Sequence, residues 1–245
     1  MASDWDAATY DRVSDPQARW ALDVIERIAG DPSVILDAGC GSGRVTELLL
    51  DRFPDADVIG LDASGSMIEQ TRQRLEKFGK RVTLAHMSLL QPIPFTVDTV
   101  FSNAVFHWVD DHDRLFANLA QALRPNGQLV AQWGGKGNVA RLIEAADATH
   151  VRGPHPRRFM GAEETTERLR RAGFEEIRVW LHEAPADFAT REEFVEYLRT
   201  VCLRCHLDLV PESERDAFLN GVADRLPDMR IDYVRINAVA HRAAT

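Results

Sequence analysis

Three features that would place this chain in a specialised class are scarce or missing. It has 3 cysteines in 245 residues, too few for a disulfide scaffold in a chain of this size. No run approaches the roughly 20 apolar residues that span a bilayer, and the acidic start lacks an export pattern. The 29 Lys and Arg residues are outnumbered by 38 Asp and Glu residues, and this net charge of −9 disfavours binding to nucleic-acid phosphates. We therefore expect a globular cytoplasmic protein without membrane or nucleic-acid partners.

The sequence does have a clear alternation of short apolar runs and amphipathic segments. Runs rich in β-branched residues predict buried strands at 33–38, 57–62, 81–85, 97–102 and 128–133. Apolar residues at helical spacing predict helices between these strands. Such alternation is typical of a mostly parallel sheet with helices on both faces. In such sheets ligands bind beyond the carboxyl ends of the strands.

The second half is less regular but continues the same fold. Helices are predicted at 139–148, 162–172, 191–205 and 211–226, and strands at 176–182 and 233–241. The expected fold class is α/β, with a doubly wound, seven-stranded, mostly parallel, Rossmann-like sheet and helical insertions near the C-terminus. No linker divides the chain, so we expect a single domain over 1–245.

A glycine-rich turn follows the first predicted strand. Residues 37–43 read Asp-Ala-Gly-Cys-Gly-Ser-Gly. Glycines at alternate positions leave room for a ligand against the backbone, and the helix that follows points its free N–H groups at that ligand. A plain tight turn between strand and helix is the alternative interpretation.

An acidic residue ends the second predicted strand. Asp62 follows Gly39 by 23 residues, the position at which dinucleotide folds grip a ribose diol. A helix cap is the alternative role for Asp62. A dinucleotide would need its third glycine one position later, where the chain has Arg44. Asp37 instead suits a ligand that carries an ammonium group, such as S-adenosylmethionine.

Four segments, in this order, resemble the motifs of class I S-adenosylmethionine-dependent methyltransferases. They are residues 34–43, 59–67, 101–108 and 123–129. Within that superfamily the chain resembles the trans-aconitate methyltransferase group. This second resemblance includes Asp4, Trp5, Asp6 and Tyr10 near the start, and residues 200–204.

The resemblance implies methyl transfer from S-adenosyl-L-methionine to a small-molecule acceptor, with S-adenosyl-L-homocysteine as the product. The acceptor is either a carboxylate, as in trans-aconitate, or another O, N or C nucleophile. The resemblance divides the domain into an N-terminal lid or helix (1–30), a donor-binding core (31–135) and an acceptor side (136–245). A dinucleotide-dependent oxidoreductase and a non-catalytic S-adenosylmethionine-binding protein are the alternatives. We expect a monomer or a homodimer.

The donor-site residues implied by the resemblance lie at the carboxyl ends of the first four strands. They are Asp37, Gly39, Cys40, Gly41, Gly43, Asp62, Ala63, Met67, Met87, Ser88 and Asn103. The chain departs from the family after the third strand. There the family has an acidic residue that pairs with the adenine amino group, and this chain has His86, Met87 and Ser88.

The acceptor side is predicted from fewer residues. His107 is a candidate general base or a pocket wall, because its unperturbed pKa is near neutrality and it follows the fourth-strand motif. Trp133 either lines the acceptor pocket or closes the core. Trp5 and Tyr10 are expected in the lid, and Arg204 is a candidate anchor for a carboxylate. We expect no metal site.

Overall fold

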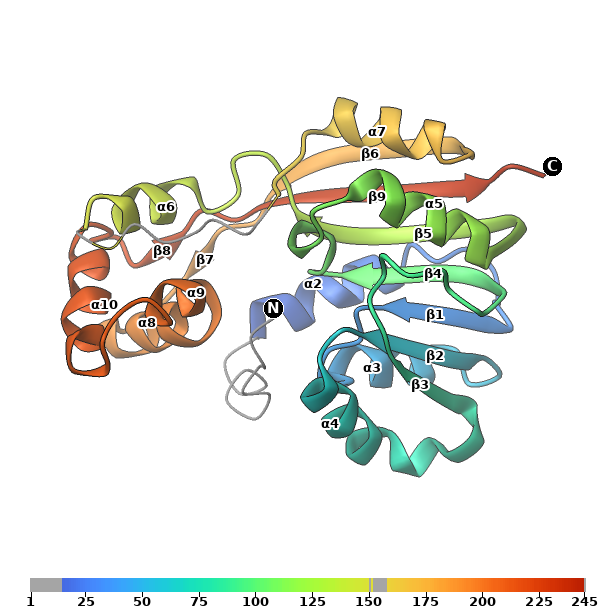
Figure 1. The fold of residues 1–245 in the computed structure, drawn as a ribbon, viewed down its shortest axis with the longest axis horizontal. Helices are drawn as coiled ribbons and strands as arrows, with labels where there is room; N and C mark the ends of the chain where they lie inside the picture. Colours follow the sequence, from blue (N-terminus) through green and yellow to red (C-terminus); the bar gives the residue numbers. More distant parts are fainter. Residues whose placement is uncertain (1–14, 150, 152–157, 245) are drawn as a thin grey trace.

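The computed structural model describes residues 15–149, 151 and 158–244, with side chains from Trp20 onward, so Trp5 and Tyr10 lie outside the described residues. Its centre is a seven-stranded sheet in the order β3-β2-β1-β4-β5-β9-β6 (Figure 1). The strands are β1 (Val34–Ala38), β2 (Asp57–Asp62), β3 (Val82–His86), β4 (Val97–Asn103), β5 (Leu123–Gly134), β6 (Phe174–Glu183) and β9 (Val234–Arg242).

The strand order reverses at β1. β1 pairs in parallel with β2 on one side and with β4 on the other, and Asp37 lies in register with both Gly60 and Phe101. Among these seven strands β9 alone runs antiparallel, between β5 and β6. The predicted doubly wound, mostly parallel sheet is therefore confirmed. The last strand lies inside the sheet rather than at its edge.

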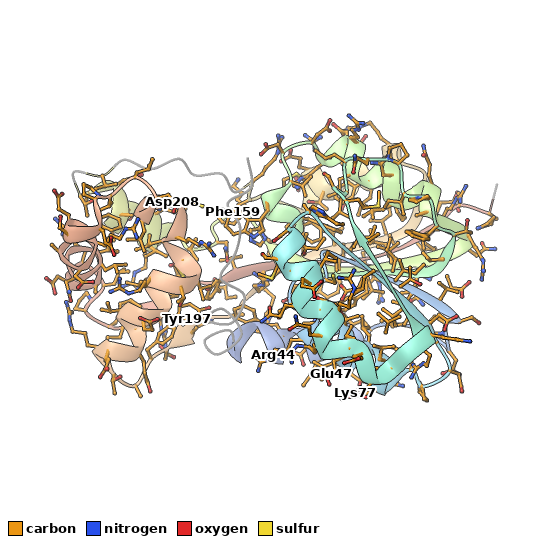
Figure 2. The ribbon with its side chains drawn as sticks, turned by 60° about the horizontal axis from the view of Figure 1, so that its bottom comes forward. Arg44, Glu47, Lys77, Phe159, Tyr197 and Asp208 are labelled. Atoms are coloured by element: carbon orange, nitrogen blue, oxygen red, sulfur yellow. The ribbon has the colours of Figure 1, made fainter. Side chains whose placement is uncertain are left out.

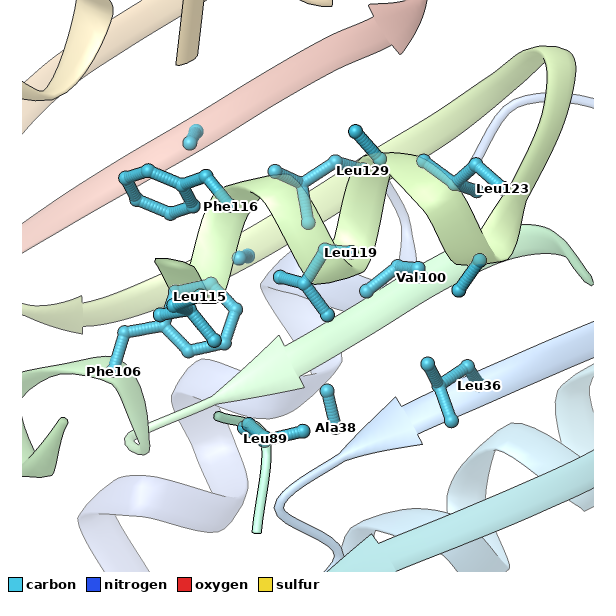
Figure 3. Close-up of a cluster of buried hydrophobic side chains, with 14 of the residues drawn as sticks. Leu36, Ala38, Leu89, Val100, Phe106, Leu115, Phe116, Leu119, Leu123 and Leu129 are labelled. Carbon is cyan, nitrogen blue, oxygen red and sulfur yellow. The ribbon is translucent and has the colours of Figure 1, made fainter. Parts of the chain in front are cut away.

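Helices cover both faces of the sheet. On one face α2 (Asp15–Ile25), α3 (Arg44–Arg52) and α4 (Gly65–Leu75) bury their apolar sides. On the other, α5 (His112–Ala122) and α7 (Ala162–Arg171) enclose a core that includes Leu36, Val100 and Leu129 (Figure 3). Burial on both faces explains why the central strands are almost continuously apolar.

A second apolar core lies beyond the end of the sheet and forms what we call the helical lobe (Figure 1). It contains α6 (Ala140–Asp147), α8 (Arg191–Tyr197), α9 (Arg204–Leu207) and α10 (Arg215–Asp224), with the short strands β7 (Ala186–Asp187) and β8 (Arg230–Ile231). The lobe joins the sheet through β6 and β9, and through the chain that leaves β5.

Two predicted elements differ from the structure. The helix expected over 191–205 is broken after α8 by a π-helical turn, Leu198–Cys202. Val201, Cys202 and Leu203 are all buried, and three consecutive residues cannot share one face of a regular α-helix. The strand expected from Gln128 begins instead at Leu123, and residues 124–127 bulge out of its ladder with β4.

Among the described residues no helix combines the length and the apolar character that crossing a bilayer requires.

Candidate functional site

The glycine turn is bent over the end of β2. The backbone N–H groups of Gly39 and Cys40 both donate to the carbonyl oxygen of Leu61, at 2.8 and 2.9 Å. The Gly43 N–H donates to the carbonyl oxygen of Cys40 at 3.0 Å and closes the turn before α3 begins. The turn thus brings the amino end of α3 to the carboxyl edge of the sheet.

The glycines of this turn serve different purposes. A Cβ atom on Gly39 would lie 2.3 Å from Cγ2 of Val105, so packing against the chain after β4 requires a glycine there. Gly43 is likewise crowded by Thr71, whose Cγ2 would lie 2.8 Å from a Cβ. Around Gly41 no atom lies within 4 Å of that position. The Cβ position is therefore open at Gly41, whereas neighbouring side chains fill it at Gly39 and Gly43.

Asp62 fixes the turn from the neighbouring strand. One carboxylate oxygen accepts the Gly41 N–H at 2.9 Å, and the other accepts the Ser64 N–H at 2.8 Å. Burial raises the pKa of Asp62, although these backbone hydrogen bonds act in the opposite direction. Each carboxylate oxygen has a second lone pair. Asp62 can therefore hold the turn and still accept hydrogen bonds from a diol. The helix cap beside it is Ser64, which accepts the Met67 N–H.

Asp37 is a carboxylate enclosed at the end of β1. Its side chain is 2% exposed and accepts a hydrogen bond from the Thr46 hydroxyl at 2.6 Å. Burial raises the pKa of Asp37 to about 7; the Thr46 hydrogen bond lowers it and the charge of Asp62 raises it. A buried carboxylate in this state gains most from a cationic ligand, which would favour its ionised form.

Two threonines of the site escaped the sequence prediction. Thr46 lies in the first turn of α3 and is fully buried against Asp37. Thr71 on α4 donates its hydroxyl to the carbonyl oxygen of Gly41 at 2.6 Å. Each is a polar residue on the apolar side of an amphipathic helix, and this signal could have identified them from the sequence.

The end of β3 lies beside the same edge. The Met87 N–H donates to the carbonyl oxygen of Asp62 at 2.9 Å, which places Met87 and Ser88 next to β2. The Ser88 hydroxyl accepts the Leu90 N–H at 3.2 Å, and His86 Nε2 donates to the carbonyl oxygen of Ala63 at 3.0 Å. Residues 86–88 contain no acidic side chain. Polar contacts to a nucleobase such as adenine would therefore come from the Ser88 hydroxyl and the backbone.

β4 delivers the next group of candidates. It ends at Asn103, and Ala104 then adopts a positive φ of 62° while its N–H donates to the carbonyl oxygen of Gln132. This turn directs Val105 onto the glycine turn and leads into a short 3-10 helix, η2 (Phe106–Trp108). His107 is buried there, and its Nδ1 accepts the Gly134 N–H at 3.2 Å.

The remaining acceptor-side candidates lie farther apart. Trp133 is fully buried, and its ring packs 5.1 Å from that of Phe106 and 6.4 Å from that of Phe116. Of the two expected roles, lining a pocket or closing the core, its full burial among these rings favours closing the core. Arg204 is half-buried at the start of α9 in the helical lobe.

Phe159 connects the two halves of the molecule. Its ring lies 5.9 Å from the His107 ring, and the same side chain packs against the core of the helical lobe. In Figure 2 Phe159 lies at the boundary between the lobe and the sheet, and Tyr197 lies on the side of the lobe that faces the sheet. His107 is therefore placed between the glycine turn and the helical lobe.

The sequence is similar to known methyltransferases. Residues 35–127 match a family described as methyltransferase domain. The chain is 33% identical over 231 residues to a trans-aconitate 2-methyltransferase of Methylobacterium nodulans, a match that covers 89% of this chain and 86% of the relative. It is 32% identical over 246 residues to the enzyme of the same name from Afipia carboxidovorans, covering 92% and 91%.

Solved structures share the fold. A Haemonchus contortus phosphoethanolamine N-methyltransferase in complex with S-adenosyl-L-methionine matches with a TM-score of 0.66 and 19% identity. That match covers 97% of this chain and 56% of the other, so this chain spans little more than half of that protein. The Bacillus subtilis YcgJ protein matches with a TM-score of 0.64 and 16% identity, over 92% and 99%.

The enclosed carboxylate yields a test of stability. In the unfolded chain Asp37 ionises near its ordinary pKa, whereas in the folded protein it stays protonated up to about pH 7. Unfolding of the wild type should therefore become easier as pH rises from about 4 to 7. Asp37→Asn removes the free-energy cost of ionising a buried carboxyl and keeps an oxygen that can accept the hydrogen bond from Thr46.

We expect Asp37→Asn to unfold at a higher temperature than the wild type at pH 8, with a smaller difference at pH 5. The advantage of Asp37→Asn over the wild type should be larger at pH 8 than at pH 5 by on the order of 2 kcal/mol in the free energy of unfolding, or about 5 °C in the unfolding temperature. Thermal unfolding of both proteins without ligand at the two pH values measures it. An equal difference at both pH values would contradict the raised pKa.

Proposed function

The chain belongs to the class I S-adenosylmethionine-dependent methyltransferases, and from this premise we propose that its acceptor is a carboxylate of a small organic acid, of the trans-aconitate type. The observation that carries the proposal is the length of the similarity. The trans-aconitate 2-methyltransferases align over 86% and 91% of their own length, so the similarity continues past the donor-binding core into the acceptor side. Membership of this family rules out the dinucleotide-dependent oxidoreductase and favours an enzyme over a non-catalytic binding protein.

The donor S-adenosylmethionine fits the residues at the carboxyl edge of β1 and β2. In our proposal Asp62 accepts hydrogen bonds from the ribose hydroxyls, and the open space at Gly41 lets the ligand approach the backbone. Asp37 faces the ammonium group, directly or through a water molecule. Met67, Met87 and Ser88 lie on the adenine side. The further donor-site residues are Gly39, Cys40, Gly43, Ala63 and Asn103.

The reaction needs little from the protein beyond positioning. A carboxylate oxygen forms a C–O bond to the methyl carbon while the S–C bond breaks, and the electron pair stays on sulfur, leaving an uncharged ester and an uncharged thioether. No proton moves, because a carboxylate is already ionised at neutral pH. The protein contributes by aligning the reactants and keeping water out.

The acceptor side of the proposal is built around His107 and the boundary between the sheet and the helical lobe. Arg204 is proposed as an anchor for a second carboxylate, and Trp5 and Tyr10 as parts of a lid. All of these belong, with the donor-binding core, to one domain over 1–245. Our proposal leaves the core tryptophan, Trp133, out of contact with the acceptor.

A direct assay tests the acceptor class. The purified chain is incubated with methyl-labelled S-adenosylmethionine and trans-aconitate, citrate, a primary amine or a phenol, and each product is then treated with mild alkali. We expect label in the acids only, released as methanol by alkali, because carboxyl methyl esters hydrolyse under these conditions. Alkali-stable label, or label in the amine or phenol instead of the acids, would contradict the proposal.

A substitution at Asp62 tests donor binding. Because a hydrogen bond to a charged group contributes about 1.5–3 kcal/mol, Asp62→Ala should weaken S-adenosylmethionine binding about 10- to 100-fold in calorimetry. Asp57→Ala, at the exposed amino end of the same strand, is the matched control and should leave the affinity unchanged. A loss below about 3-fold in Asp62→Ala would show that Asp62 does not hold the ribose.

The pH dependence of donor binding tests Asp37. Below about pH 7 this carboxyl becomes protonated, so it loses its attraction for an ammonium group. The affinity for S-adenosylmethionine should fall on the order of tenfold between pH 7.5 and 5.5. The affinity for methylthioadenosine, which has the nucleoside but lacks the ammonium group, should fall much less. Parallel pH profiles for the two ligands would remove Asp37 from the ammonium site.

A further inference from the structure

The imidazole of His107 is held in one orientation. It lies 5.2 Å from the Trp108 ring and 5.9 Å from the Phe159 ring, measured between centroids. The His107 backbone is fixed as well, because its carbonyl oxygen accepts the Arg158 N–H at 2.8 Å. With its side chain buried and aromatic rings beside it, the imidazole has little freedom to rotate.

The partner of Nδ1 determines where the imidazole carries its proton. The Gly134 N–H points at Nδ1 over 3.2 Å, and a backbone amide nitrogen can only donate. Nδ1 is therefore an acceptor without a proton of its own. A neutral imidazole has one N–H, so that proton is on Nε2.

This arrangement conflicts with the role of general base. A base needs a lone pair that can reach the substrate, and the ring's basic lone pair is directed at the Gly134 amide. A proton added at Nδ1 would lie against the Gly134 N–H. His107 is thus built to donate a hydrogen bond through Nε2 and not to remove a proton.

The position of the ring indicates what it donates to. Val105 packs onto Gly39 in the glycine turn, and His107 follows two residues later, toward Phe159 and the helical lobe. The imidazole therefore lies between the donor-binding turn and the acceptor side. An N–H donor at this place suits an anionic acceptor, which needs no base, better than an amine or a hydroxyl that must lose a proton.

We propose that His107 binds the reacting carboxylate by donating Nε2–H to one of its oxygens, leaving the other oxygen to attack the methyl carbon. This inference rests on the proposed carboxylate acceptor. It assigns His107 to the recognition of an acid and removes it from proton transfer. The Gly134 amide then acts as the positioning group that fixes the tautomer.

Two substitutions separate a donor from a base. Glutamine has an N–H donor and cannot take up a proton at neutral pH, whereas leucine has neither capacity. His107→Gln should keep kcat/KM for the acid within about fivefold, and His107→Leu should lose about 10- to 100-fold, mainly through KM. If His107→Gln is as impaired in kcat as His107→Leu, or if His107→Leu loses nothing, the inference is overturned. Unchanged S-adenosylmethionine affinity in both variants serves as the control that the fold and the donor site are intact.

The tautomer itself can be measured without any acceptor. Nitrogen-15 NMR of protein labelled at histidine, with the His107→Gln variant used for assignment, should show a proton on Nε2 and none on Nδ1. A proton on Nδ1 would overturn the inference whatever the acceptor is. Alkali-stable methylation together with the expected tautomer would instead contradict the proposed acceptor while leaving the Nδ1 assignment in place.

Discussion

A carboxylate buried where β1 ends is the constraint on which the site depends. Asp37 is in register with both neighbouring strands, so the sheet itself encloses it and little water can reach it. One hydroxyl, from Thr46, stabilises it without a compensating charge. Burying Asp37 therefore lowers the stability of the folded protein, and a bound cation would offset this loss. The same burial strengthens the binding of a cationic ligand.

On the acceptor side the ligand is proposed to be an anion, so the negative charge of the protein opposes its binding. With a net charge of −9 the protein as a whole repels an anionic acceptor, but salt screens this repulsion beyond about 8 Å at physiological ionic strength. Recognition then depends on donors within contact distance. A fixed N–H from His107 can supply attraction there without adding a second cation close to a sulfonium.

The fold could be predicted from the sequence wherever local periodicity decides it. The strand expected at 57–62 is β2, with the same bounds, and Asp62 stands at its carboxyl end as expected. The prediction of one helix over 191–205 was wrong because packing between distant segments decides there: the run is apolar on too many sides for one helix and breaks at a π-helical turn. Distant packing also acts on Gly39, where Val105 leaves no room for a Cβ atom, a constraint that the glycine motif alone does not reveal.

The role of His107 shows why residue type and spacing were insufficient for the site. Residue type and spacing left His107 as either a general base or a pocket wall, and nothing in the neighbouring sequence decides between the two. The contact that decides its chemistry comes from the Gly134 amide, at the end of the next strand of the sheet. Strand pairing brings that amide to Nδ1, so the architecture of the sheet, and not the residue itself, selects between accepting a proton and donating a hydrogen bond.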